Sequence, residues 1–145
     1  MDLFSSMRIS ATGLDAQTKR MNTISSNIAN AETTETEEGG PYRKKDAVFT
    51  ATPDRENFSE ILAGEMDEKA QGVLVTEVRE DPRPPRMVYN PSHPHANAEG
   101  YVAMPNVNMT EEMANMISAQ RSYEADVTAM NTAKAMAQKA LEIGR

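Results

Sequence analysis

Apolar residues recur along the last third of the chain with alternating spacings of four and three residues. The two polar gaps in this row keep the same register, and no proline occurs from residue 107 to the end. Apolar residues at heptad spacing line one stripe of an α-helix and have to pack against a neighbouring helix. The pattern predicts a coiled-coil helix over residues 108–145. The row contains Met109, Met113, Met116, Gln120, Tyr123, Val127, Met130, Lys134, Ala137 and Leu141.

A second heptad pattern occupies residues 1–31. One of its rows contains Met7, Leu14, Met21 and Ile28, and the other contains Leu3, Ser10, Gln17 and Ile24. The start of the C-terminal helix is also marked, because Asn108 is a good capping residue and Glu111 follows three positions later. Two helices of comparable length at opposite ends of a chain favour an antiparallel pair.

The middle of the chain, residues 32–107, predicts loops and a few short strands. It opens with the acidic, turn-rich segment ETTETEEGG. Candidate strands follow at residues 42–51, 72–80, 87–89 and 100–104, because β-branched and aromatic residues alternate there between turn-forming ones. Residues 54–69 are expected to form a mobile or helical insertion.

We therefore expect a mainly α fold. Long N- and C-terminal helices are predicted to form an antiparallel coiled-coil hairpin, with a small β-rich module and flexible loops between them. The three predicted segments are an N-terminal coiled-coil helix at 1–31, a linker and β module at 32–107 and a C-terminal coiled-coil helix at 108–145.

The amino-acid composition narrows the range of possible functions. Only 5% of the residues are aromatic, tryptophan and cysteine are absent, and the net charge of -7 is concentrated between the two helices. A nucleic-acid-binding protein would carry a basic surface, so no nucleic-acid partner is expected. The N-terminus lacks the apolar core of a secretory signal, and no apolar run approaches the roughly 20 residues of a membrane span.

Few residues of the sequence are candidates for metal binding or catalysis. His93 and His95 could supply two metal ligands, but closed zinc sites require four, and a structured turn explains the SHPHA segment better. The basic triplet at residues 43–45 is interpreted as a local charge partner of the neighbouring acidic run. No Cys nucleophile, phosphate-binding loop or Ser–His–acid set is evident, so we expect no enzyme, no catalytic or metal site and no cofactor.

Two motifs carry a resemblance to a known family. Residues 11–34, ATGLDAQTKRMNTISSNIANAETT, are similar to the N-terminal signature of bacterial flagellar axial proteins. The run from residue 72 to residue 136, which includes DPRPPRMVYNPSHPHA and GYVAMPNVN, closely resembles the FlgC-type proximal rod proteins of the flagellar basal body. The resemblance covers nearly the whole chain and is weakest at residues 54–69. The segment ETTETEEGG departs from the family pattern.

The matching positions fall in both terminal regions. In the N-terminal signature they are Ser26, Asn27, Ile28, Ala29 and Asn30. In the C-terminal region they are Pro105, Asn106, Val107, Asn108, Glu111, Glu112, Met116, Ile117, Arg121 and Tyr123.

The resemblance implies a structural subunit that polymerises through its terminal helices into a hollow drive shaft. This rod transmits torque, crosses the periplasm and surrounds an export channel. Implied partners are copies of the chain, other rod proteins, membrane-ring proteins at the rod base and the flagellar type III export apparatus. The implied route of export needs no cleaved signal peptide, and the terminal helices are expected to be poorly ordered in the free subunit.

The apolar stripes indicate where such a subunit would assemble. A hairpin buries only one seam, so the remaining apolar surface predicts contacts with other chains. The predicted assembly interface consists of Leu14, Met21, Ile24, Asn27, Ile28, Asn30, Met113, Met116, Ile117, Gln120, Tyr123, Val127, Met130 and Leu141. Three alternatives are a cytoplasmic, dimeric coiled-coil adaptor, another flagellar axial protein, and a metal-dependent enzyme that uses the two histidines.

Overall fold

Two long helices and two short β-ribbons make up the part of the chain that the structure describes. The computed structural model describes residues 3–52 and 71–143, so the predicted insertion at 54–69 lies outside the described residues. The helices are α1 (Leu3–Ala29) and α3 (Met109–Ile143), and the strands are β1 (Lys45–Thr52), β2 (Gly72–Glu80), β3 (Arg86–Tyr89) and β4 (Tyr101–Met104). The predicted strand positions are confirmed to within a few residues.

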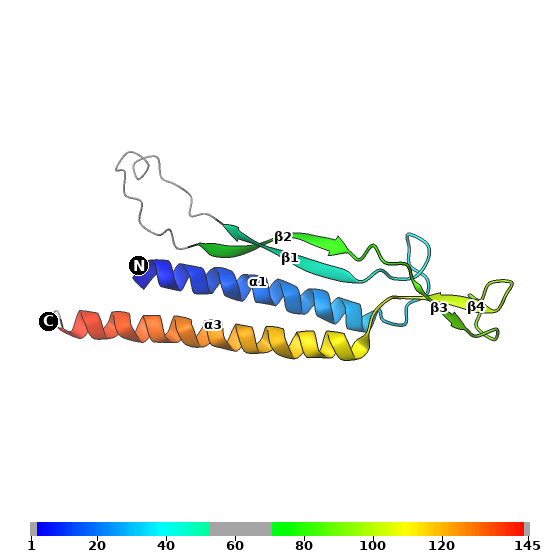
Figure 1. Cartoon of the computed structure of the whole chain (residues 1–145). Helices are drawn as coiled ribbons and strands as arrows, with labels where there is room; N and C mark the ends of the chain where they lie inside the picture. Colours follow the sequence, from blue (N-terminus) through cyan, green and yellow to red (C-terminus); the bar gives the residue numbers. More distant parts are fainter. Residues whose placement is uncertain (1–2, 53–70, 144–145) are drawn as a thin grey trace, which may run out of the picture.

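The elements form an elongated molecule (Figure 1). Helices α1 and α3 lie side by side and run in opposite directions, and the β1–β2 ribbon lies along the other side of α1. The β3–β4 ribbon projects beyond the end of the helices, away from the chain termini. Helix α1 is therefore the middle layer of the structure.

The predicted fold class was wrong. The described residues form a mixed α/β structure with two separate two-stranded antiparallel sheets, not a mainly α coiled-coil hairpin. The physical reason is that α1 buries two faces, one against α3 and one against β1 and β2. Heptad spacing reports that a helix has an apolar stripe, but it does not reveal which kind of element covers that stripe.

Helix α3 also turns a different row inward from the one predicted. Every second member of the predicted row is Met113, Gln120, Val127, Lys134 and Leu141; Val127 is half-buried, and the other four are exposed. Instead Glu112, Ala119 and Ala133 are buried, with exposed fractions of 1%, 0% and 2%, and Asp126 is half-buried. Of the other members of the predicted row, Met116, Tyr123, Met130 and Ala137 are half-buried.

Small residues set the distance between α1 and α3. A Cβ atom on Gly13 would lie 2.7 Å from the Asp126 Oδ2 atom, so the backbone of α1 approaches the side chains of α3 closely there. Ala16 is also buried, with 1% of its surface exposed. Alanine and glycine at a helix–helix contact allow the two backbones to come near one another.

The C-terminal part of α3 extends past the start of α1. Asn27 contacts Glu112, and Gly13 lies against Asp126. The interval from Asn27 back to Gly13 on α1 and the interval from Glu112 to Asp126 on α3 are both 14 residues. An antiparallel pairing with this register places the start of α1 opposite residues near Met136. The last turns of α3 therefore have no α1 residue beside them, and Leu141 is 74% exposed.

The two ribbons are regular apart from one irregularity. Strands β1 and β2 pair from Lys45–Glu80 to Thr52–Gly72, with a register shift between Val48 and Phe49. Strands β3 and β4 pair from Arg86–Met104 to Tyr89–Tyr101. The Tyr89 and Tyr101 rings meet edge to face, with centroids 5.3 Å apart.

The close helix approach yields a first prediction. Ala119→Leu should lower the free energy of unfolding by about 1–3 kcal/mol, because the added methylenes have no room between the helices. Ala129→Leu is the matched control, since Ala129 is exposed on the same helix, and its effect should stay within about 0.5 kcal/mol. Urea unfolding followed by circular dichroism measures both, and equal effects would contradict the predicted packing.

Candidate functional site

The end of α1 is joined to β1 and α3 by the side chain of Asn27. Its Nδ2 atom donates to the Lys45 carbonyl oxygen (2.8 Å) and to the Glu112 Oε2 atom (2.9 Å). Its Oδ1 atom accepts from the Tyr42 hydroxyl (3.0 Å) and from the Lys45 amide nitrogen (2.9 Å). Asn27 is fully buried, and all of its hydrogen-bonding capacity is used.

A buried ion pair lies next to Asn27. The Lys44 Nζ atom is 3.0 Å from the Glu112 Oε1 atom, and the two side chains are 7% and 1% exposed. Burial alone would lower the pKa of the Lys44 ammonium. Hydrogen bonding and attraction to Glu112, aided by Asp46 and Glu111, outweigh burial and raise this pKa above its ordinary value. We call Asn27, Tyr42, Lys44 and Glu112 the buried junction.

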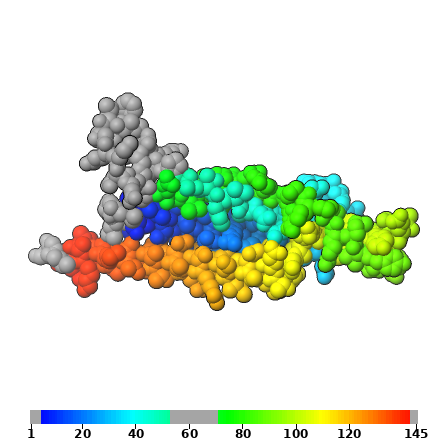
Figure 2. Space-filling model, viewed as in Figure 1, coloured from blue at the N-terminus to red at the C-terminus, as the bar shows by residue number. Residues whose placement is uncertain are grey.

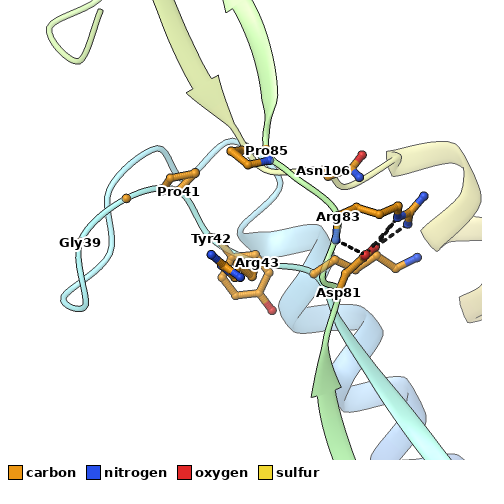
Figure 3. A pocket seen from close by; sticks show the side chains of 10 residues that line it. Gly39, Pro41, Tyr42, Arg43, Asp81, Arg83, Pro85 and Asn106 are labelled. Carbon is orange, nitrogen blue, oxygen red and sulfur yellow. Dashed lines mark hydrogen bonds and ion pairs between the residues drawn. The ribbon is translucent and has the colours of Figure 1, made fainter. Parts of the chain in front are cut away.

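The junction continues into the segment after β2. The Asp81 amide donates to the Lys44 carbonyl oxygen (2.8 Å), and the Asp81 carboxylate accepts from the side chain and backbone of Arg83. These hydrogen bonds lower the pKa of Asp81 to about 2. Figure 3 shows this pair at one side of a pocket of about 190 Å³, which Tyr42, Pro85 and Asn106 also line.

The histidines predicted as alternative metal ligands lie in the loop of the β3–β4 ribbon. The His95 Nδ1 atom is 2.9 Å from the Thr34 hydroxyl, and its Nε2 atom is 3.0 Å from the Glu35 carboxylate. The His95 amide donates to the His93 Nδ1 atom (3.1 Å). Among residues 3–52 and 71–143, no three His, Cys, Asp or Glu side chains are grouped to hold a metal ion.

The predicted interface residues fall into three groups. Two are buried inside the chain, Ile24 and Asn27. Eight are half-buried, namely Leu14, Met21, Ile28, Asn30, Met116, Tyr123, Val127 and Met130. Four are exposed, namely Met113, Ile117, Gln120 and Leu141. The structure therefore does not gather all of these residues on one open surface.

Exposed apolar side chains follow one another at the start of α3. Met109, Met113 and Ile117 stand four residues apart and are 38%, 52% and 53% exposed. We call these three residues the exposed α3 row. Helix α3 forms a continuous band along one long edge of the molecule (Figure 2). A row of large apolar side chains left in contact with solvent is typical of an interaction surface.

Sequence reasoning missed two features. Lys44 was expected to pair with the neighbouring acidic run, but its closest carboxylate belongs to Glu112, far along the chain. The second feature is the outer face of the β3–β4 ribbon, where Met87, Tyr89 and Tyr101 are 52%, 65% and 40% exposed. The pairing of Tyr89 with Tyr101 places these rings on one face, and no local sequence signal gives that pairing.

Comparisons with known proteins identify the class. Residues 7–35 match the family model for flagella basal body rod proteins. Residues 98–143 match the model for the C-terminal region of the flagellar basal body rod FlgEFG proteins. The two matches cover most of α1 and all of α3, including both helical sides of the buried junction. These two matches, at opposite ends of the chain, define the class as a flagellar basal-body rod protein.

Full-length relatives narrow the class to one family. The chain is 45% identical to the flagellar basal-body rod protein FlgC of Bacillus subtilis, over 100% of both chains. It is 41% identical to FlgC of Borreliella burgdorferi, over 99% of this chain and 98% of that one. It is 40% identical to FlgC of Salmonella typhimurium over 100% of both chains. The chain belongs to the FlgC family of flagellar basal-body rod proteins, and the resemblance seen in its sequence is confirmed.

The buried junction yields a second prediction. Asn27→Ala should destabilise the chain by about 3 kcal/mol or more, because it leaves buried groups on β1 and α3 without partners. Asn22→Ala, on the exposed surface of the same helix, should change the free energy of unfolding by less than about 0.5 kcal/mol. Chemical denaturation of both variants tests the difference, and a similarly small effect for Asn27→Ala would rule out a structural role for the junction.

The Asp81–Arg83 pair yields a third prediction. A depressed pKa stabilises the fold above the unfolded value of 3.8, and this contribution disappears as the pH falls towards about 2. Arg83→Gln should therefore raise the pKa of Asp81 towards its ordinary value. Carboxyl-carbon NMR titration measures that pKa directly. An unchanged midpoint would show that Arg83 is not the cause of the shift.

Proposed function

We propose that this chain is a structural subunit of the flagellar proximal rod and assembles through its two terminal helices. Full-length similarity to FlgC proteins supports the rod role. The observation that carries the assembly surface is the exposed α3 row, together with the uncovered end of α3 at Leu141. Neither helix in the described part of the chain has the length and apolarity needed to cross a membrane.

The physical basis of assembly is burial of this uncovered apolar surface. Covering apolar area contributes roughly 25 cal/mol per Å². Association also costs translational, rotational and side-chain freedom, so a contact of a few residues is weak when it forms alone. A rod in which several neighbours cover each subunit sums many such contacts. Long helices suit this arrangement, because they distribute the contacts along the direction in which the subunit is extended.

In this proposal the predicted interface residues have different roles according to their burial. The exposed residues Met113, Ile117, Gln120 and Leu141 would contact neighbouring subunits directly. The half-buried residues would contribute the sides of the same surfaces. Ile24 and Asn27, being buried, would act from inside by holding α1 against α3.

The proposed partners are copies of this chain, other rod proteins and membrane-ring proteins at the rod base. The assembled rod would cross the periplasm and surround the export channel. Export by the flagellar type III apparatus, without a cleaved signal peptide, is part of the same proposal. A structural rod subunit needs no cofactor and no catalytic group for this role.

The proposal yields a fourth prediction. Ile117→Asp should abolish swimming and the formation of rods and hooks, because a carboxylate in a covered apolar contact loses its hydration. The isolated subunit should keep the helical content and stability of the parent, since Ile117 is 53% exposed. Swimming assays and electron microscopy of basal bodies give the readout. Ile117→Leu is the control and should support normal rods.

If cells with Ile117→Asp form normal rods, the exposed α3 row is not part of the assembly surface. A deletion of the whole chain tests the broader claim separately. Cells without the chain should lack hooks and filaments, and swimming by such cells would contradict the rod function itself.

A further inference from the structure

Methionine is the only sulfur-containing residue type in this chain. The sequence contains eleven Met and no Cys, so thioethers are its only sulfur groups. Four described methionines are exposed: Met87 at 52%, Met109 at 38%, Met113 at 52% and Met136 at 56%. Met116, one turn from Met113 on the same helix, is half-buried. Oxidation of methionine depends on access to the sulfur, so these residues differ in their expected reactivity.

We propose that Met113 is an oxidation site through which peroxide controls assembly of the free subunit. This inference rests on the proposed function, because it concerns the surface that assembly covers. Met113 is the central member of the exposed α3 row, between Met109 and Ile117. Its sulfoxide places a polar, chiral group in the middle of an apolar surface, and the oxidised subunit then fits its neighbours poorly.

The chemistry requires only a hydroperoxide such as hydrogen peroxide. The lone pair of the thioether sulfur attacks one peroxide oxygen, an S–O bond forms and the O–O bond breaks. The departing hydroxide takes the proton of the transferred oxygen and leaves as water. Sulfur is oxidised by two electrons, and the peroxide is reduced by two. No metal or protein base takes part in this step.

Assembly and oxidation are coupled through the same surface. Neighbouring subunits that cover Met113 exclude peroxide from its sulfur, so the assembled rod is protected. Independently of this protection, the polar sulfoxide of a subunit that is already oxidised would have to be buried in an apolar contact, and the cost of burying it disfavours assembly. The site therefore distinguishes free from incorporated subunits, and only the free subunit responds to the oxidant.

The reactivity of individual methionines is the first test. The purified chain and isolated basal bodies are exposed to hydrogen peroxide, and sulfoxide at each methionine is quantified by peptide mass spectrometry. In the free chain, Met113 should react several-fold faster than Met116. In basal bodies, Met113 should react several-fold more slowly than it does in the free chain. Equal rates at Met113 and Met116 in the free chain, or no protection in basal bodies, would overturn the inference.

The effect on assembly is the second test. Cells that form new basal bodies receive a peroxide dose that halves the number of new rods in the parent strain. Met113→Leu keeps the apolar volume but removes the sulfur, so this strain should form nearly the untreated number of rods. Met87→Leu, which removes an equally exposed sulfur on the β3–β4 ribbon, should behave like the parent. Equal sensitivity of the Met113→Leu strain and the parent would contradict the proposal.

Loss of the rod function and loss of the oxidation site give different experimental results. If the chain is absent from basal bodies of untreated cells, the rod function itself is wrong. If the chain is present and untreated rods are normal, but Met113→Leu gives no resistance to peroxide, only the oxidation site is wrong.

Discussion

The rest of the structure depends on the buried junction around Asn27. One amide side chain binds the backbone of β1 and the carboxylate of Glu112, and it fixes the end of α1 against the start of α3. Lys44 neutralises the buried Glu112, so the carboxylate is paired and hydrogen-bonded where water cannot reach it. Breaking a buried pair by removing one partner is strongly destabilising, because an uncompensated charge remains. Segments at opposite ends of the sequence are thus held together at the buried junction, and from there the two helices extend towards the chain termini.

The contacts between α1 and α3 change in kind with distance from that junction. Near it, α1 lies between α3 and the β1–β2 ribbon, and polar contacts add to the packing. Further along, the seam between the helices relies on small residues such as Ala16, Ala119 and Ala133, each of which buries little apolar surface. Beyond the start of α1, no other helix of residues 3–52 and 71–143 lies beside the last turns of α3, and Leu141 is 74% exposed. In the proposed rod, neighbouring subunits would cover this exposed end of α3, whereas the buried junction holds the opposite end within the subunit.

The sequence predicted individual elements better than their arrangement. Capping by Asn108 was predicted and is confirmed, since its Oδ1 atom accepts from the Thr110 amide at 3.1 Å. The strand that begins at Gly72 was also predicted, because alternation of side chains is a local property. The fold class was wrong because heptad spacing does not reveal that β1 and β2, and not another helix, cover the second face of α1. The inward row of α3 was a separate miss, because the larger Met113 and Val127 suggested a row in which Met113 is exposed and Val127 is only half-buried. The buried row contains Glu112, whose burial depends on Lys44 and Asn27 from distant parts of the chain. Such long-range pairing is invisible to periodicity. The family, in contrast, was evident from the N-terminal motif and from the run between residues 72 and 136.

Hydrogen exchange of backbone amides tests the central claim most directly. The free chain and the chain in isolated basal bodies are compared residue by residue along α3. In the free chain, amides close to the buried junction, near Met116, should exchange slowly, and those beyond the start of α1, near Leu141, should exchange fast. In basal bodies, protection should extend along the whole helix, because neighbours cover it. Uniformly slow exchange along α3 in the free chain would contradict the claim that this helix depends on the junction at one end and on assembly at the other.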